Sequence, residues 1–237
     1  MELRYAPLER IDVPHPVDRL AYMAEACRDK FVLDLGAMDE TAYESKRGLG
    51  TWLHERLAAV AKRVVGVDSS PAVPRAGLVT APNATIMRGD VACLDAILTE
   101  LGSRPDVVVA GELIEHLPDP LAFLKGLAST PQLRGCSIIL STPNATALHN
   151  VAIGLLSRES THHDHLCILS YKTLNTLCSR AGFDTFEIVP YRAAFPEMRS
   201  RHSGFAGVAV ACGEKVINGV EWLFPLLSFG YIVRATI

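Results

Sequence analysis

The stretch FVLDLGAMDE, residues 31–40, sets a short apolar run directly before a glycine turn. FVLDL, residues 31–35, is almost continuously apolar, which is typical of a parallel strand buried on both faces. Gly36 follows where that strand ends, and a residue without a Cβ lets the backbone approach a ligand closely. Similar apolar runs alternate with helical patterns along the chain, so the sequence predicts a parallel sheet covered by helices.

The apolar runs and the 3.6-residue periodicity give the expected elements. Seven strands are expected at residues 31–35, 63–68, 84–87, 106–110, 137–141, 183–189 and 230–235. Helices are expected at residues 17–28, from about residue 51, and at 93–101, 120–129, 171–181 and 216–227. Ser170 is expected to cap the helix at 171–181, and Gly182 to end it.

The composition excludes several classes of protein. With 237 residues, 49% of them hydrophobic, the chain can fill a core and is neither disordered nor a disulfide mini-protein. The net charge of −3 makes nucleic acid an unlikely partner. The six cysteines lie far apart, and no signal peptide or membrane-length apolar run is visible, so we expect a cytoplasmic protein that needs no membrane.

Ligands of an open parallel sheet bind beyond the carboxyl ends of its strands. The four turns at those ends are therefore the candidate binding positions. They read DLGAMDE (34–40), DSS (68–70), GDV (89–91) and GELIEHL (111–117).

Six segments between residues 30 and 190 resemble, in their order, the class I methyltransferases that use S-adenosylmethionine. They are VLDLG (32–36), VVGVD (64–68), MRGDV (87–91), DVVVAGELIEHLPDP (106–120), GCSIILSTPN (135–144) and LCSRAGFDTFEIV (177–189). The resemblance implies an α/β fold of the Rossmann-like, doubly wound kind, with a seven-stranded, mostly parallel sheet, an antiparallel last strand and helices on both faces. It implies a single methyltransferase domain over residues 1–237, with the cofactor half at about 30–143 and acceptor-binding insertions at about 144–165 and 191–227.

The resemblance also implies the cofactor site. Asp68 would accept hydrogen bonds from the ribose hydroxyls, and Asp90 with the Val91 N–H would bind the adenine; a helix cap and a turn aspartate are the plain alternatives. Asp34 would orient the loop or bind the cofactor's ammonium group. The expected cofactor-binding residues are Asp34, Gly36, Ala37, Met38, Asp68, Ser69, Asp90, Val91 and Gly111.

The turn after Gly36 departs from the family, which has further glycines there. Here Ala37, Met38 and Asp39 follow, and Asp68 comes 32 positions after Gly36, a longer connection than usual. Either Gly48 and Gly50 complete the cradle, or residues 39–50 form a lid. A nicotinamide enzyme needs a G-x-G-x-x-G turn, which is missing here. The acidic residues Asp39 and Glu40 would also repel the pyrophosphate of a nicotinamide cofactor.

The segment after the fourth expected parallel strand carries the candidate chemistry. His116, flanked by Glu112 and Glu115, is the expected base for methylation of a hydroxyl on a small molecule such as a sugar or secondary metabolite. The E-x-x-E-H spacing with His165 also permits a divalent cation such as Mg²⁺, bound by Glu112, Glu115, His116 and His165. That set resembles the metal-dependent RNA 2′-O-methyltransferases, which gives one alternative function. A non-catalytic cofactor-binding partner subunit is another, and a structural role for His116 stays open.

Other polar groups are candidates for the acceptor site. Asn144 and His165 are expected near the substrate, and the histidines at 162, 163 and 165 form either a functional cluster or a solvated loop. Arg192, Arg199, Arg201 and His202 could grip an acidic group on the acceptor or stand in solvent. The helix at 216–227, with Trp222 and Phe224, is expected in the core or at the surface of a homodimer.

Overall fold

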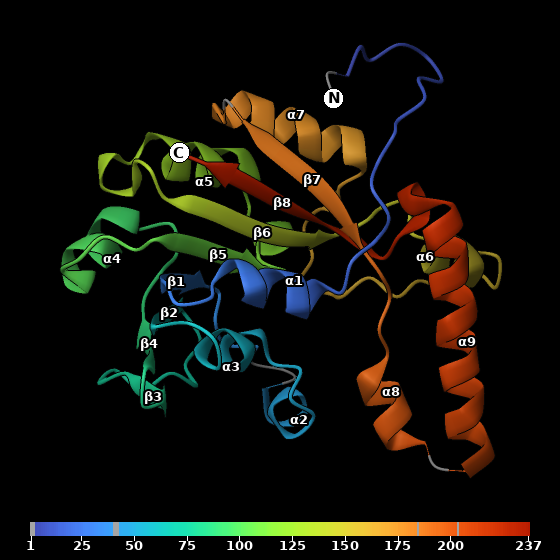
Figure 1. Cartoon of the computed structure of the whole chain (residues 1–237), viewed down its shortest axis with the longest axis horizontal. Helices are drawn as coiled ribbons and strands as arrows, with labels where there is room; N and C mark the ends of the chain where they lie inside the picture. The colour runs from blue at the N-terminus through green and yellow to red at the C-terminus, as the bar shows by residue number, and fades with distance from the viewer. Residues whose placement is uncertain (1–2, 40–42, 184, 203) are drawn as a thin grey trace.

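A computed structural model describes residues 3–39, 43–183, 185–202 and 204–237. In this part of the chain one sheet runs through the molecule, with helices against both faces (Figure 1). Its strand order is β3-β4-β2-β1-β5-β6-β8-β7. The strands are β1 (Phe31–Leu35), β2 (Arg63–Asp68), β3 (Leu78–Ala81), β4 (Ala84–Arg88), β5 (Val107–Gly111), β6 (Ser137–Pro143), β7 (Phe186–Tyr191) and β8 (Gly230–Thr236).

The strand directions confirm the predicted mostly parallel sheet. β1 pairs in parallel with β2 and β5, and parallel pairing continues from β2 to β4 and from β5 to β6. The last strand, β8, lies antiparallel between β6 and β7. The chain proceeds outward from β1 to β4 and then returns to place β5 beside β1, so the strand order reverses between β1 and β5. Ligand sites of such sheets lie at that reversal.

The predicted number of seven strands is wrong, because the described residues form eight. The additional strand, β3, pairs antiparallel with β4 across a turn at Pro82 and Asn83. Its four residues carry no fully buried side chain, and Val79 is 75% exposed. A short edge strand of this kind lacks the apolar pattern that reveals a buried strand.

Two cores form because successive side chains of a strand point to opposite faces. On one face Leu33 and Leu35 pack with α4 (Leu94–Leu101), α5 (Pro120–Ser129) and α7 (Tyr171–Ala181). On the other face Val32 packs with α1 (Arg19–Ala26) and α3 (Leu53–Ala58). Helices on both faces are therefore confirmed.

The helix ends follow local capping. α7 has the predicted bounds: the Ser170 side chain accepts from the Thr173 N–H, and Gly182 adopts φ +94°. α1 is shorter than the expected 17–28, because the Asp18 side chain caps it by accepting from the Ala21 N–H. α3 begins at Leu53, two residues after the expected start, and ends at Ala58.

Four further helices lie in connections between these elements. They are α2 (Tyr43–Gly48), α6 (Leu148–Gly154), α8 (Pro196–Arg201) and α9 (Gly204–Leu223). α8 and α9 pack side by side and extend away from the sheet (Figure 1). None of the described helices is long and apolar enough to span a membrane.

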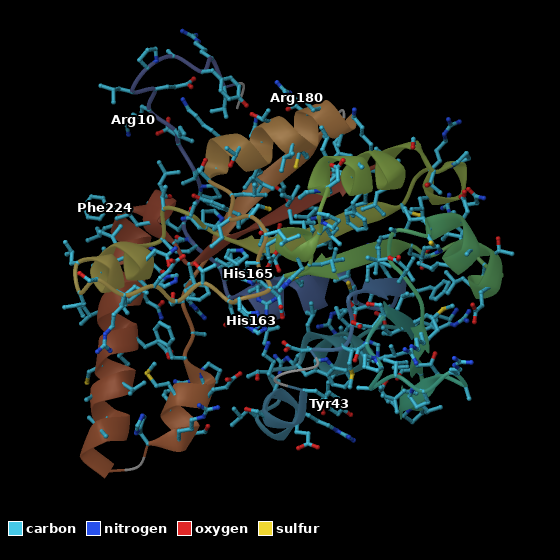
Figure 2. The ribbon with its side chains drawn as sticks, turned by 180° about the vertical axis from the view of Figure 1, so that it is seen from behind. Arg10, Tyr43, His163, His165, Arg180 and Phe224 are labelled. Carbon is cyan, nitrogen blue, oxygen red and sulfur yellow. The ribbon has the colours of Figure 1, made fainter. Side chains whose placement is uncertain are left out.

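α9 differs from the helix expected at 216–227. It begins at Gly204 and stops at Leu223, because Pro225 starts a separate 3₁₀ turn, Pro225–Leu227. Trp222 is 54% exposed and Phe224 is 59% exposed, and Phe224 lies at the outer edge of the molecule (Figure 2). The expected core position of this segment is therefore wrong, and the homodimer stays a prediction.

Candidate active site

A cavity of about 520 Å³ opens at the carboxyl ends of β1, β2 and β5, beside the reversal of strand order. Parallel strands bring turns that are distant in sequence to this one edge. The cavity wall includes Asp34, Gly36, Ala37, Met38, Asp68 and Gly111 of the expected cofactor set, and Glu112, His116 and His165 of the expected catalytic and metal set.

Gly36 and Asp68 form the floor of this first cavity. Gly36 adopts φ +73°, and a Cβ there would lie 2.9 Å from Leu113 Cδ1. The Met38 N–H donates to Asp68 Oδ2 at 2.8 Å and the Ser70 N–H donates to Oδ1 at 2.9 Å. These bonds orient the carboxylate at the carboxyl end of β2.

Asp34 lies deeper and has a partner that the sequence did not reveal. His54 Nδ1, on α3, lies 2.9 Å from Asp34 Oδ2, and His54 Nε2 lies 3.0 Å from Thr80 Oγ1. Both Asp34 and His54 are buried. Because His54 lies on a helix 20 positions further along the chain, no local sequence pattern could identify it as the partner of Asp34.

Several expected cofactor residues lie outside this cavity, as far as the described residues define its wall. Ser69 and Asp90 are exposed, and the Asp90 carboxylate accepts from the Ala92 N–H at 2.9 Å, as a turn aspartate does. The Val91 side chain packs in the core. Gly48 and Gly50 do not line the cavity either; Lys46 and Thr51 take that place. The adenine role of Asp90 and Val91 stays a prediction.

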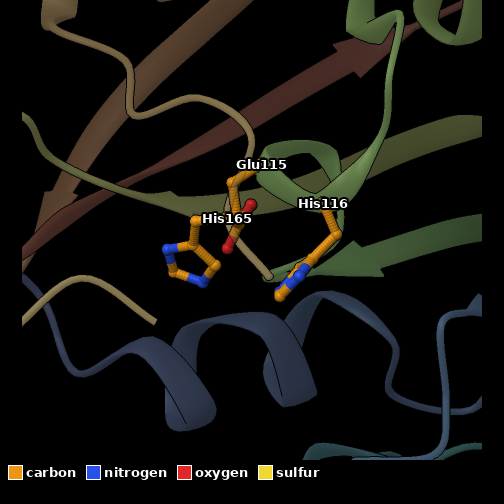
Figure 3. Close-up of side chains that lie close together, drawn as sticks. All are labelled: Glu115, His116 and His165. Carbon is orange, nitrogen blue, oxygen red and sulfur yellow. The ribbon is translucent and has the colours of Figure 1, made fainter. Parts of the chain in front are cut away.

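Glu115, His116 and His165 come together at one side of the cavity (Figure 3). One potential ligand atom from each residue lies within 4.8 Å of the others. Glu115 is fully buried, and Thr142 Oγ1 donates to its Oε2 at 3.1 Å. Burial, with a smaller contribution from the charge of Glu112, raises the pKa of Glu115 to about 9. Glu115 Oε1 and His165 Nδ1 are buried and have no hydrogen-bond partner among the described residues.

Glu112 stays outside that cluster, contrary to the expected four-residue set. It adopts φ +53°, which costs a non-glycine residue on the order of 1–3 kcal/mol. Its N–H donates to Ser141 O at 3.0 Å, and Tyr191 OH donates to its Oε1 at 3.0 Å. Arg19 Nη1 lies 4.0 Å from the same oxygen. The sequence did not indicate Tyr191, because the expected strand ended two residues before it.

Asn144 is directed into the protein, and its substrate role stays a prediction. Its side chain is buried, and Nδ2 donates to the carbonyls of Leu226 at 2.9 Å and Ser228 at 2.8 Å. The amide thus ties the end of β6 to the segment before β8. A polar residue directly after a strand can point into the ligand site or into the protein, and the sequence does not distinguish the two.

In the histidine-rich loop at residues 162–165, two histidines line the first cavity and one lies in solvent. His165 stacks edge-on against His116 with ring centroids 4.6 Å apart, and His162 also lines the first cavity. His163 is exposed; Figure 2 shows it beside His165 near the middle of the molecule.

A second cavity of about 760 Å³ adjoins the first. The two share Arg19, Lys46, Thr51, Glu112 and Glu197 in their walls. Apolar side chains, among them Phe195, Met198 and Phe229, line it together with Arg192, Arg199, Arg201 and His202. The structure therefore places two adjoining cavities beside the carboxylate and histidine groups.

Comparison with known proteins gives one consistent result. The family model described as a methyltransferase domain matches residues 14–188. A protein named ubiquinone biosynthesis O-methyltransferase, from Cereibacter sphaeroides, is 30% identical over 178 residues, which are 70% of either chain.

Two solved structures share the fold. One is an S-adenosylmethionine-dependent methyltransferase from Thermotoga maritima, with TM-score 0.55 and 15% identity over 92% of this chain and 87% of that one. The other is the small RNA methyltransferase HEN1, with TM-score 0.56 and 19% identity over 92% of this chain and 24% of that one. At these identities the likeness concerns the fold alone.

Proposed function

This chain belongs to the class I S-adenosylmethionine-dependent methyltransferases, and we propose that it methylates a hydroxyl oxygen of a small molecule with the help of a divalent cation. The proposal has three parts: where the cofactor binds, which residues hold the metal, and which group receives the proton of the acceptor.

The first cavity fits S-adenosylmethionine, which supplies a methyl group on a positively charged sulfur. Asp68 can accept from both ribose hydroxyls, and Gly36 keeps the floor open for the chain beyond the ribose. Acidic side chains outnumber cationic ones in the described wall, which suits a sulfonium. The acidic residues are Asp34, Asp39, Asp68, Glu112, Asp164 and Glu197; the cationic ones are Arg19 and Lys46.

The Glu115, His116 and His165 cluster fits a divalent cation. A buried polar atom without a partner is costly, and this cluster contains two such atoms, Glu115 Oε1 and His165 Nδ1. Carboxylate and imidazole together suit Mg²⁺, Mn²⁺ or a later transition metal. A cation bound there would lower the pKa of an adjacent acceptor hydroxyl. This pair of unpartnered atoms is the observation that carries the proposal of oxygen as the methylated atom.

Glu112 is then the group placed to take the acceptor proton. It lines both cavities, whereas His116 lines only the first and belongs to the metal cluster. Tyr191 occupies Glu112 Oε1, which leaves Oε2 for the acceptor. We therefore assign the role of the base to Glu112, whereas the sequence pattern indicated His116.

A small acceptor is supported by the second cavity and by the curated relative. A volume of about 760 Å³ is typical of small-molecule sites. The relative is named an O-methyltransferase of ubiquinone biosynthesis, and we extend from it only the transfer of methyl to oxygen. RNA methylation at a 2′-hydroxyl would use the same cluster, so it is an outcome of the test below.

The test supplies radiolabelled S-adenosylmethionine with a panel of phenols and catechols, the matching aromatic amines, and a small RNA duplex. We expect label on a hydroxyl compound, loss of labelling with EDTA, and recovery with added Mg²⁺ or Mn²⁺. Labelling of amines alone would refute oxygen as the acceptor, and EDTA-insensitive labelling would refute the metal. Labelling of RNA that weakens steeply with salt would establish the alternative. The Glu115→Gln variant should lose the metal-restored labelling.

A further inference from the structure

The helix α2 contributes Lys46 to the wall of the first cavity and is held there by contacts of its neighbours. Trp52 Nε1 donates to the Ala37 carbonyl at 2.9 Å, and the rings of Tyr43 and Trp52 pack edge to face with centroids 4.8 Å apart. Lys46, on α2, forms an ion pair with Asp39, the third residue after Gly36. The chain therefore places an ion pair in the wall of the first cavity, three residues after Gly36.

Lys46 lies at the border between the two cavities. It lines both of them, while Asp39 lines only the first. The side chains of Lys46 and Asp39 are 29% and 33% exposed, so both charges face the cavity and are partly shielded from solvent. A ligand in the first cavity can reach both.

The amino-acid end of the cofactor should lie near this border between the two cavities. The methyl group must lie where the first cavity meets the second, because the acceptor approaches from the second. The amino-acid chain hangs from the same sulfur as the methyl group, and the ribose on that sulfur's third arm belongs at Asp68. The ammonium and carboxylate of the cofactor therefore lie near the residues that both cavities share.

Two cations line this border, Arg19 and Lys46, and each has an acidic partner. Arg19 Nη1 donates to Ser141 Oγ at 3.3 Å, lies 4.0 Å from Glu112 Oε1, and its guanidinium stands 5.8 Å from the centre of the Tyr191 ring. Lys46 has Asp39 as its only ion-pair partner among the described residues. Lys46 and Asp39 thus present two opposite charges side by side in the cavity wall.

We propose that the Asp39–Lys46 pair recognises the amino-acid end of the cofactor. Lys46 donates to the carboxylate, and Asp39 accepts from the ammonium group. In this arrangement each charge of the cofactor's ammonium and carboxylate groups lies beside an opposite charge of the protein. The net charge of the site does not change, because the zwitterion is neutral. The pair thereby distinguishes S-adenosylmethionine from an adenine nucleoside without the amino-acid end. This inference rests on the proposed function, because it places the cofactor in the first cavity and the acceptor in the second.

Calorimetry without acceptor tests the proposal. S-adenosylhomocysteine carries the zwitterion, whereas methylthioadenosine has the same nucleoside and sulfur but lacks the amino-acid end. For Lys46→Met we expect about 10-fold weaker binding of S-adenosylhomocysteine. Binding of methylthioadenosine should change by less than about twofold. Arg47→Met, on the same helix and exposed, is the matched control and should leave both affinities unchanged.

A second ligand assigns the two charges separately. Decarboxylated S-adenosylmethionine keeps an ammonium group and lacks the carboxylate, so Lys46→Met should bind it as the wild type does, while Asp39→Asn should bind it more weakly. Unchanged binding of S-adenosylhomocysteine by Lys46→Met would overturn the proposal, and so would an equal loss for methylthioadenosine. These measurements use no methyl acceptor, so they stand even if methylation of a small-molecule hydroxyl is refuted.

Discussion

Replacing Gly36 with alanine should weaken both the fold and the binding of the cofactor. Gly36 adopts φ +73°, and the left-handed region costs a residue with a Cβ about 1–2 kcal/mol. The new Cβ would lie 2.9 Å from Leu113 Cδ1, the end of a side chain that can move, which adds about 1 kcal/mol. We therefore expect Gly36→Ala to lose about 2–3 kcal/mol of unfolding free energy in urea.

Cofactor binding should weaken because the alanine side chain at position 36 would project toward the first cavity. Both Gly36 and Leu113 line the first cavity, so an added Cβ and a displaced leucine narrow it. Calorimetry with S-adenosylhomocysteine should show at least about 10-fold weaker binding.

Gly102→Ala provides the matched control for this prediction. Gly102 has nearly the same backbone angle, φ +67°, at the end of α4, and nothing lies within 4 Å of its virtual Cβ. It should lose about 1 kcal/mol of stability and keep wild-type affinity. Wild-type affinity in Gly36→Ala, or equal loss of affinity in both variants, would refute the assignment of the first cavity to the cofactor.

Three other substitutions test separate contacts. Asp68→Ala should weaken S-adenosylhomocysteine binding by about 1–3 kcal/mol in calorimetry, because charge-assisted bonds to the ribose are lost. Tyr191→Phe, which removes the donor to Glu112, should lower kcat by about 10-fold at unchanged S-adenosylhomocysteine affinity; a change in affinity alone would contradict its positioning role. Burial raises the pKa of Glu221 to about 7. The folded state therefore holds that proton more tightly than the unfolded chain, and stability falls as the pH rises from about 4.5 to about 7. In urea unfolding at pH 5 and pH 8, Glu221→Gln should remove about 2 kcal/mol of that fall, and an unaltered pH dependence would contradict the cause.

Much of the fold was predictable because its strands are buried on both faces. The bounds of β1 and β2 match the expected ranges, since FVLDL and RVVGVD are apolar runs between polar turns. β3 was missed because its residues are partly exposed and it pairs at the edge of the sheet. The sequence placed the start of α9 at residue 216, whereas it lies at Gly204. Small and apolar residues continue on both sides of residue 216, so the apolar pattern does not mark the true start.

The site was predictable where a turn directly follows a parallel strand. Asp34, Gly36 and Asp68 share one cavity because the carboxyl ends of neighbouring parallel strands meet at one edge. His54 and Tyr191 were missed, since each comes from an element distant in sequence and contacts the site only through the tertiary fold.

Crystals grown with S-adenosylhomocysteine and Mn²⁺, measured at a wavelength where manganese scatters anomalously, test the central claim most directly. We expect an anomalous peak bounded by Glu115, His116 and His165, together with a nucleoside whose ribose hydroxyls contact Asp68. A map with no peak at those three side chains, and with the nucleoside away from Asp68, would contradict it.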